Sequence, residues 1–225
     1  MDIQLNYYEI GYGMPLILLH GNGEDMTYFK YQVECFSQYF RVIAIDSRGH
    51  GRTPRGTAPF TIRQFADDLH AFMDAHEINK AHILGYSDGG NVAMCFALKY
   101  PERVGKLILN GANLYPLGVK LSAQIPITIQ YILEKRKKND PEAKHNAELL
   151  GLMVNDPYIS PNELKALNIP TLVIAGEDDL IRESHTKKIA RCIPNARLAI
   201  LPGGHAVAAM NPEAFNAEVL DFLLN

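Results

Sequence analysis

A serine lies between two glycines in the sequence Gly85-Tyr86-Ser87-Asp88-Gly89, which follows an apolar segment and precedes an amphipathic one. This order predicts a strand, a sharp turn and a helix, and such a turn lifts a serine hydroxyl above the edge of a sheet. The glycines fit this interpretation because side chains at their positions would collide across so tight a turn. Ser87 is therefore a candidate nucleophile, and the alternative is a glycine-rich turn with an incidental serine.

A nucleophilic serine needs a base that accepts its proton, an acid that orients the base, and hydrogen-bond donors for the oxyanion. His205 is the candidate base, because it follows the last apolar segment and the glycine-containing turn 202–204. It also comes last in the chain order serine, acid, histidine. The alternative is an exposed loop histidine with no part in catalysis.

Three consecutive carboxylates, Glu177, Asp178 and Asp179, follow the predicted strand 171–175 and supply the candidates for the acid. We take Asp179 as the first candidate and Asp178 as the second. At least one of the three is expected only to stabilise the N-terminus of the next helix, where negative charge is favourable. Position 113, after the preceding strand, is the other place from which an acid could come, but it holds asparagine.

Two backbone N–H groups are the candidate oxyanion donors, that of Asp88 after the nucleophile and that of Asn22. Asn22 lies in the glycine-containing loop 20–23 after the predicted strand 15–19, and glycines let a backbone approach a substrate closely. The alternative is a plain turn, since Asn-Gly is a common turn pair. Three roles are open for the side chain of Asp88: it stabilises the start of a helix, favours a cationic substrate or raises the basicity of His205.

Six apolar or aromatic side chains close to these candidates are predicted to line the substrate pocket. They come from the loops that follow the predicted strands and from the segment 113–165. The chemistry implies no metal ion and no organic cofactor. The predicted pocket residues are Met26, Tyr86, Leu114, Tyr115, Met153 and Val207.

Seven apolar segments of strand length must position these residues, and longer amphipathic segments lie between most of them. The last five strands are nearly continuous in apolar character, as expected of parallel strands buried on both faces. This alternation predicts an α/β fold with a mostly parallel, doubly wound sheet and helices on both faces. The predicted strands are 5–10, 15–19, 41–45, 81–85, 105–109, 171–175 and 196–201, and the predicted helices are 25–39, 61–76, 89–100, 122–138, 142–154, 183–192 and 212–224.

Residues 113–165 interrupt the alternation, because they contain no convincing buried strand. Two amphipathic helices are predicted there, 122–138 and 142–154, bounded by prolines. An insertion between two strands, on the side where the strands end, is a candidate lid over a ligand site. We therefore predict one domain, residues 1–225, with residues 113–165 as a lid or cap; the alternative is a pair of ordinary packing helices.

The composition is that of an ordinary globular protein without a strong charge bias. Of the 225 residues, 47% are hydrophobic and 21% are charged, and the formal net charge is −3. This charge gives no reason to expect nucleic acid or a membrane as a partner. The one basic run, 135–138, is followed by acidic residues, so we interpret it as the solvated end of a helix.

Three widely spaced cysteines suggest neither a disulfide framework nor a metal site, which fits a reducing compartment. The N-terminus shows no basic segment followed by an apolar one, so no signal peptide is expected. The longest apolar runs are too short to span a bilayer. The expected location is the cytoplasm, and the expected partner is a small acyl substrate, bound by a monomer or a homodimer.

Five motifs follow one another along the chain: LLHGNG at 18–23, DSRGHGR at 46–52, GYSDG at 85–89, GEDD at 176–179 and GGH at 203–205. They occur in the order found in the α/β-hydrolase superfamily, and the chain resembles that family along essentially its whole length. In that family the acid commonly lies three residues after a glycine like Gly176, which supports Asp179. The resemblance also implies a structural role for Asp46, Arg48 and His50.

The residues and the resemblance together predict a serine hydrolase. Ser87 attacks an ester, a thioester or a similar carbonyl, and water then releases the acyl group. The short chain and the compact cap favour small acyl groups over long-chain lipids. The alternatives are a lyase, a C–C bond hydrolase or a perhydrolase that uses the same serine, histidine and acid (the triad), and a small-molecule receptor that keeps the triad for binding. They stay open because fold and triad do not fix the reaction.

Overall fold

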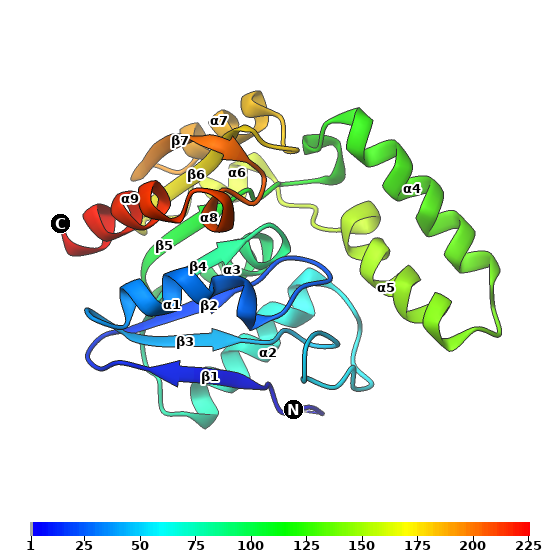
Figure 1. The fold of residues 1–225 in the computed structure, drawn as a ribbon, viewed down its shortest axis with the longest axis horizontal. Helices are drawn as coiled ribbons and strands as arrows, with labels where there is room; N and C mark the ends of the chain where they lie inside the picture. The colour runs from blue at the N-terminus through cyan, green and yellow to red at the C-terminus, as the bar shows by residue number, and fades with distance from the viewer. Residues whose placement is uncertain (1) are drawn as a thin grey trace.

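The computed structural model describes residues 2–225 and contains one sheet of seven strands (Figure 1). The strand order is β1-β3-β2-β4-β5-β6-β7, and every neighbouring pair is parallel except β1 with β3. The prediction of seven strands in a mostly parallel sheet is confirmed. The strands are β1 Tyr7–Ile10, β2 Pro15–Leu19, β3 Arg41–Ile45, β4 Ala81–Tyr86, β5 Val104–Asn110, β6 Thr171–Asp178 and β7 Ala196–Gly204.

Helices cover both faces of the sheet, as the alternating pattern predicted (Figure 1). One core lies between the sheet and the helices α2, α3 and α7, and the other lies between the sheet and α1, α8 and α9. The helices are α1 Lys30–Phe36, α2 Ile62–Ala75, α3 Asp88–Lys99, α4 Leu121–Arg136, α5 Pro141–Asn155, α6 Pro161–Leu164, α7 Glu183–Cys192, α8 Val207–Met210 and α9 Pro212–Leu224.

Three local features differ from the sequence-based expectation. The single helix predicted for 25–39 is a 3₁₀ turn, Met26–Phe29, followed by α1, and the Asp25 carboxylate caps the turn by accepting from the N–H of Thr27. The short helices α6 and α8 were not predicted, because four residues are too few to show helical periodicity. Strand β7 is partly exposed, since it forms the edge of the sheet beyond β6.

The segment 113–165 forms the helical insertion expected between β5 and β6, and α4 and α5 are its main part. We call this segment the cap. Its two long helices run beside each other at one side of the sheet (Figure 1), joined by hydrogen bonds from Gln124 Nε2 to the Met153 carbonyl and from Asn155 Nδ2 to the Tyr131 hydroxyl. Within residues 2–225, none of these helices or any other is long and apolar enough to cross a bilayer.

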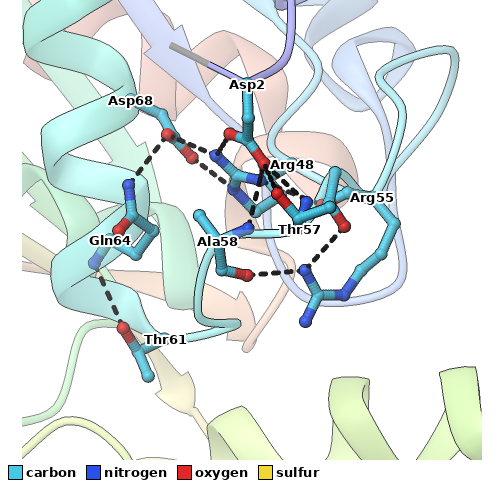
Figure 2. A network of polar contacts seen from close by, with 9 residues as sticks. Asp2, Arg48, Arg55, Thr57, Ala58, Thr61, Gln64 and Asp68 are labelled. Atoms are coloured by element: carbon cyan, nitrogen blue, oxygen red, sulfur yellow. Dashed lines mark hydrogen bonds and ion pairs between the residues drawn. The ribbon is translucent and has the colours of Figure 1, made fainter.

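The loop after β3 is held by a buried arginine (Figure 2). The Arg48 guanidinium, whose side chain is fully buried, donates to both carboxylate oxygens of Asp68 on α2 and to both of Asp2 near the N-terminus. Burial of a charge is costly unless the charge is paired and hydrogen-bonded, and here both conditions are met. Arg48 therefore ties together three segments that are distant in the sequence.

Asp46 and His50 also make structural contacts in this loop. The Asp46 carboxylate accepts from Asn6 Nδ2 and from the N–H groups of Met26 and Arg52, at 2.8 to 2.9 Å. The Nδ1–H of His50 donates to the Arg48 carbonyl at 2.9 Å, and burial lowers the pKa of His50 to about 4. These contacts hold the loop that lies beside the candidate site.

Candidate active site

Ser87 occupies the turn between the last residue of β4 and the first residue of α3. Its backbone has φ 54° and ψ −119°, and a positive φ of this kind is rare for a residue with a side chain. A Cβ atom at Gly85 would lie 2.1 Å from the Gly89 carbonyl oxygen, and one at Gly89 would lie 2.0 Å from the Leu19 carbonyl oxygen. The close approach of β2, β4 and α3 therefore requires both glycines and exposes the serine hydroxyl.

The base and acid candidates meet Ser87 from two other strand ends. His205 follows β7, and its Nε2 lies 2.9 Å from Ser87 Oγ. Asp179 follows β6, and its Oδ1 lies 2.7 Å from His205 Nδ1. With the proton on Nδ1, His205 donates to Asp179 and accepts from the serine hydroxyl, which is the tautomer that a general base needs.

The structure places only one of the three consecutive carboxylates against His205. Asp179 is 3% exposed, and its Oδ1 also accepts from the N–H of Ile181 at 2.8 Å. Glu177 and Asp178 are exposed at the end of β6. The geometry therefore favours Asp179 over Asp178 as the partner of the imidazole.

Gly111 contributes to the site, although sequence reasoning missed it. It has φ 61°, and a Cβ atom there would lie 2.8 Å from His205 Cε1. A larger residue would push the imidazole from its place between Ser87 and Asp179. The available signal was a glycine directly after a buried strand, which marks a turn or a close approach.

Both candidate oxyanion donors belong to residues that border the cavity beside Ser87. The N–H of Asp88 is the first of α3, so it has no acceptor within the helix. Asn22 lies two residues after His20. The Nδ1–H of His20 donates to the Gly21 carbonyl at 2.7 Å, and its Nε2 accepts from the N–H of Ser47 at 3.0 Å. The side chain of His20 therefore fixes the start of the loop that carries Asn22.

The Asp88 side chain is buried in a network of amides. Its Oδ2 accepts from Asn22 Nδ2 at 2.8 Å, and its Oδ1 accepts from Asn91 Nδ2 at 3.2 Å. Asn91 Nδ2 also donates to Asn113 Oδ1 at 3.0 Å, so the side chain of Asn113 belongs to this network and is not an alternative partner of the imidazole. Burial raises the pKa of Asp88, although both amide hydrogen bonds oppose that change.

A cavity of about 190 Å³ opens over Ser87 and His205, between the sheet and the cap. Of the six predicted pocket residues, Tyr86 and Met153 line it. Sequence reasoning missed two polar residues that line the cavity, Glu24 and Gln124, because they lie far from the serine along the chain. The other lining residues are Gly21, Asn22, Asp88, Asn113, Val119, Ile127, Leu180 and Ile181.

The remaining four predicted pocket residues do not line this cavity. Leu114 and Val207 are fully buried in the two cores. The Tyr115 hydroxyl accepts from Lys188 Nζ at 3.1 Å, and Met26 packs against the core that lies between the sheet and α1, α8 and α9. Proximity in the sequence to a loop residue does not give the direction of a side chain, because tertiary packing turns each one toward the core or the solvent.

A larger cavity, of about 490 Å³, opens between the cap helices and residues 55–61. None of Ser87, His205 and Asp179 borders it. Size therefore does not identify the site, and the smaller cavity contains the reactive groups. Residues 2–225 also hold no group of His, Cys, Asp and Glu side chains arranged to bind a metal ion.

Comparisons with known proteins agree with the fold. A family model described as alpha/beta hydrolase fold matches residues 14–127. RutD of Caulobacter sp. (strain K31), a protein named for carbamate hydrolysis, is 31% identical over 254 residues, covering 96% of this chain and 95% of RutD. The meta-cleavage product hydrolase CumD of Pseudomonas fluorescens IP01 has a TM-score of 0.80 at 28% identity, covering 98% of this chain and 94% of CumD. A thermophilic esterase of Thermogutta terrifontis has a TM-score of 0.82 at 27% identity, covering 98% of this chain and 93% of the esterase.

Proposed function

Because the chain belongs to the α/β-hydrolase fold family, we propose that it is a serine hydrolase that cleaves a small ester or a related carbonyl compound. The observation that carries the proposal is the unbroken series of contacts from Ser87 through His205 to Asp179 beside a cavity of about 190 Å³. A nucleophile, a base and an orienting acid in this order are the parts that acyl transfer needs.

In the first step, Ser87 Oγ forms a bond to the carbonyl carbon while its proton passes to His205 Nε2. Asp179 accepts a hydrogen bond from the Nδ1–H and stabilises the imidazolium that forms. The carbonyl oxygen becomes an oxyanion, and the N–H groups of Asn22 and Asp88 donate to it. The N-terminus of α3 adds a favourable dipole at the same place.

The imidazolium of His205 then gives its proton to the leaving group, and the bond from the carbonyl carbon to that group breaks. An acyl-enzyme on Ser87 remains. A water molecule gives a proton to His205 and attacks the acyl carbon. When the second oxyanion collapses, the bond from that carbon to Ser87 Oγ breaks, His205 returns the proton to Ser87 Oγ, and the acid product leaves. Each step uses the same base and the same donors, so no further group is needed.

The cavity supports small substrates. A volume of about 190 Å³ is below the usual range for drug-sized ligands, and the cap closes it through Gln124 and Ile127 of α4 and Met153 of α5. We therefore propose that the cap sets the preference for a short acyl group. Carbamate hydrolysis is the second candidate, favoured by the name of the 31% identical RutD, and it uses the same attack on a carbonyl carbon.

Replacement of Ser87 tests the proposal. Ser87→Ala is expected to lower kcat on p-nitrophenyl acetate by roughly 10⁴- to 10⁶-fold, because the nucleophile is lost while the fold is kept. Ser184→Ala, an exposed serine on α7, is the matched control and is expected to retain full turnover. Turnover by Ser87→Ala at the wild-type rate would exclude the mechanism.

A substrate panel separates the reaction classes. p-Nitrophenyl esters of increasing acyl length, p-nitrophenyl N-methylcarbamate, a lactone and a vinylogous diketone represent ester, carbamate, lactone and C–C bond hydrolysis. The proposal expects the short ester to have the highest kcat/KM, with a burst of p-nitrophenol followed by steady turnover. A single slow turnover with retained ligand indicates a receptor instead.

A further inference from the structure

The side chain of Asn22 joins the candidate oxyanion hole to the cap. Its Nδ2 donates to Asp88 Oδ2 and to the backbone carbonyl of Leu149, both at 2.8 Å. Asp88 begins the helix that follows the nucleophile, and Leu149 lies in the middle of α5. The two N–H bonds of this one amide group therefore connect α3, the helix that follows Ser87, with the cap.

A second polar contact holds α5 at the neighbouring residue. Arg55 donates from Nε and Nη2 to the two carboxylate oxygens of Glu148, each at 2.8 Å. Arg55 also donates from Nη1 to the Ala58 carbonyl, and its own carbonyl accepts from Arg48 Nη1, so it belongs to the network of the buried arginine (Figure 2). A bidentate pair of this kind fixes orientation as well as distance.

The loop around Asn22 depends on such side-chain contacts. Gly21 and Gly23 flank Asn22, and Gly23 has φ 71° with no atom within 4 Å of the place where its Cβ would be. His20 holds the start of the loop through the Gly21 carbonyl. Beyond that point a glycine-flanked backbone has several accessible conformations, and the contacts of the Asn22 side chain help to fix the position of the Asn22 N–H. One partner of the Asn22 side chain is the buried carboxylate of Asp88, and the other is the Leu149 carbonyl in the cap.

We propose that Arg55 and Asn22 form a two-point latch that couples docking of α5 to the oxyanion hole, with Asp88 as the positioning residue for Asn22. The inference rests on the proposed function, because it assigns the Asn22 N–H to the oxyanion. Loss of either point of the latch lets the backbone at Asn22 move, and the oxyanion then loses a donor that is well placed only when α5 is docked. The effect falls on kcat, since the donor acts mainly on the charge that develops in the reaction.

A double-mutant cycle tests the coupling. Asn22→Ala keeps the backbone N–H but loses both side-chain contacts, and it is expected to lower kcat about 10- to 100-fold with less than about a 3-fold change in KM. Glu148→Ala, which does not touch the cavity, is expected to lower kcat about 3- to 10-fold. The double variant is expected to be no slower than Asn22→Ala alone, because both changes open the same latch.

Arg63→Ala is the matched control. Arg63 also connects a core helix to the cap, by donating to the Tyr158 carbonyl at 3.2 Å and by pairing with Glu163 at 4.0 Å, and neither partner belongs to α5. Its loss is expected to leave kcat and KM unchanged. A decrease in kcat equal to that of Glu148→Ala would mean that any cap contact matters, and it would overturn the specific role of α5.

The conservative change at Asp88 separates position from charge. Asp88→Asn keeps an acceptor oxygen for Asn22 and is expected to stay within about 5-fold of the wild-type kcat, whereas Asp88→Ala is expected to fall as far as Asn22→Ala. Equal losses in the two Asp88 variants would contradict a positioning role. Circular dichroism of each variant shows whether it is folded.

Affinity for benzeneboronic acid provides a readout besides turnover. Its adduct with the Ser87 oxygen places a boronate oxygen in the oxyanion hole, so its Ki is expected to rise in parallel with the fall in kcat. Wild-type kcat and Ki in Asn22→Ala, or strictly multiplicative losses in the double variant, would overturn the latch. If Ser87→Ala is inactive in that case, the proposed function stands; if Ser87→Ala is fully active, both proposals fail.

Discussion

Asp178 and Asp179 are adjacent in the sequence, but their carboxylates lie in different surroundings. Asp178 is the last residue of β6 and is exposed, while Asp179 leaves the strand and turns inward to His205. Charge and residue type do not distinguish the two. The difference arises because the backbone direction changes at the end of β6, where the N–H of Asp179 donates to the Gly176 carbonyl at 3.3 Å.

This difference gives a prediction at the residue scale. Asp179→Asn is expected to lower kcat by about 10⁴-fold, because an amide in this place favours the wrong tautomer of His205 and leaves the imidazolium without its counter-charge. Asp178→Asn changes an exposed side chain and is expected to stay close to the wild-type rate. Steady-state kinetics on p-nitrophenyl acetate decide between them, and the reverse ranking would move the acid to Asp178.

At the scale of the elements, the turn from β4 to α3 is tightly constrained by steric exclusion. Gly89 lies against the carbonyl of Leu19, so α3 can begin under Ser87 only if that position has no side chain. Gly151 in α5 is a different case, because the nearest atom to its Cβ position is 3.5 Å away on Tyr131. The two glycines therefore have opposite consequences for stability.

We expect Gly89→Ala to lower the free energy of unfolding by more than about 3 kcal/mol, because a backbone atom blocks the new methyl group. Gly151→Ala is expected to raise it by about 1 kcal/mol, since alanine favours a helix interior and its methyl group has room. Urea denaturation measures both. A stable and active Gly89→Ala variant would show that the turn can relax, contrary to its geometry.

At the scale of the whole molecule, three histidines in different parts of the structure share one property. Burial lowers the pKa of His50, His82 and His185 from 6.5 to about 4. His185 also accepts from the N–H of Leu114 at 3.0 Å, which requires a neutral ring nitrogen. The unfolded chain binds protons at these histidines between about pH 6.5 and pH 4, while the folded chain does not.

Stability is therefore expected to fall as the pH decreases from 6.5 to 4, by up to about 1.4 kcal/mol per pH unit for each fully linked histidine. Above pH 6.5 the histidines are neutral in both states and add no pH dependence. His82→Leu is expected to reduce this slope without loss of a hydrogen bond, because His82 Nδ1 has no partner within residues 2–225. Urea midpoints at pH 7.5, 6.0 and 4.5 test this, with the exposed His145→Leu as control. An unchanged slope in His82→Leu contradicts the assignment.

The sequence by itself determined the order and type of the main elements and the places where chemistry could occur. Apolar segments indicated all seven strands. The signal was physically clearest for the inner strands, because a strand buried on both faces needs nearly continuous apolar side chains, whereas the edge strands β1 and β7 are exposed or partly exposed. Gly85 and Gly89 indicated a sharp turn at Ser87, because a turn this tight excludes side chains at the positions beside the serine, and the sequence shows those positions directly. Motif order then indicated the family to which the chain belongs.

Only the tertiary structure decided which side chains meet in the site. It brought Asp179, the first of the two candidates, to His205, placed Gly111 behind the imidazole, and formed the cavity with Glu24 and Gln124 in place of Leu114 and Val207. It also joined Asn22 to Asp88 and to α5. The physical reason is that the direction of a loop side chain depends on packing between elements that are far apart in the chain, and no local pattern of residues encodes that packing.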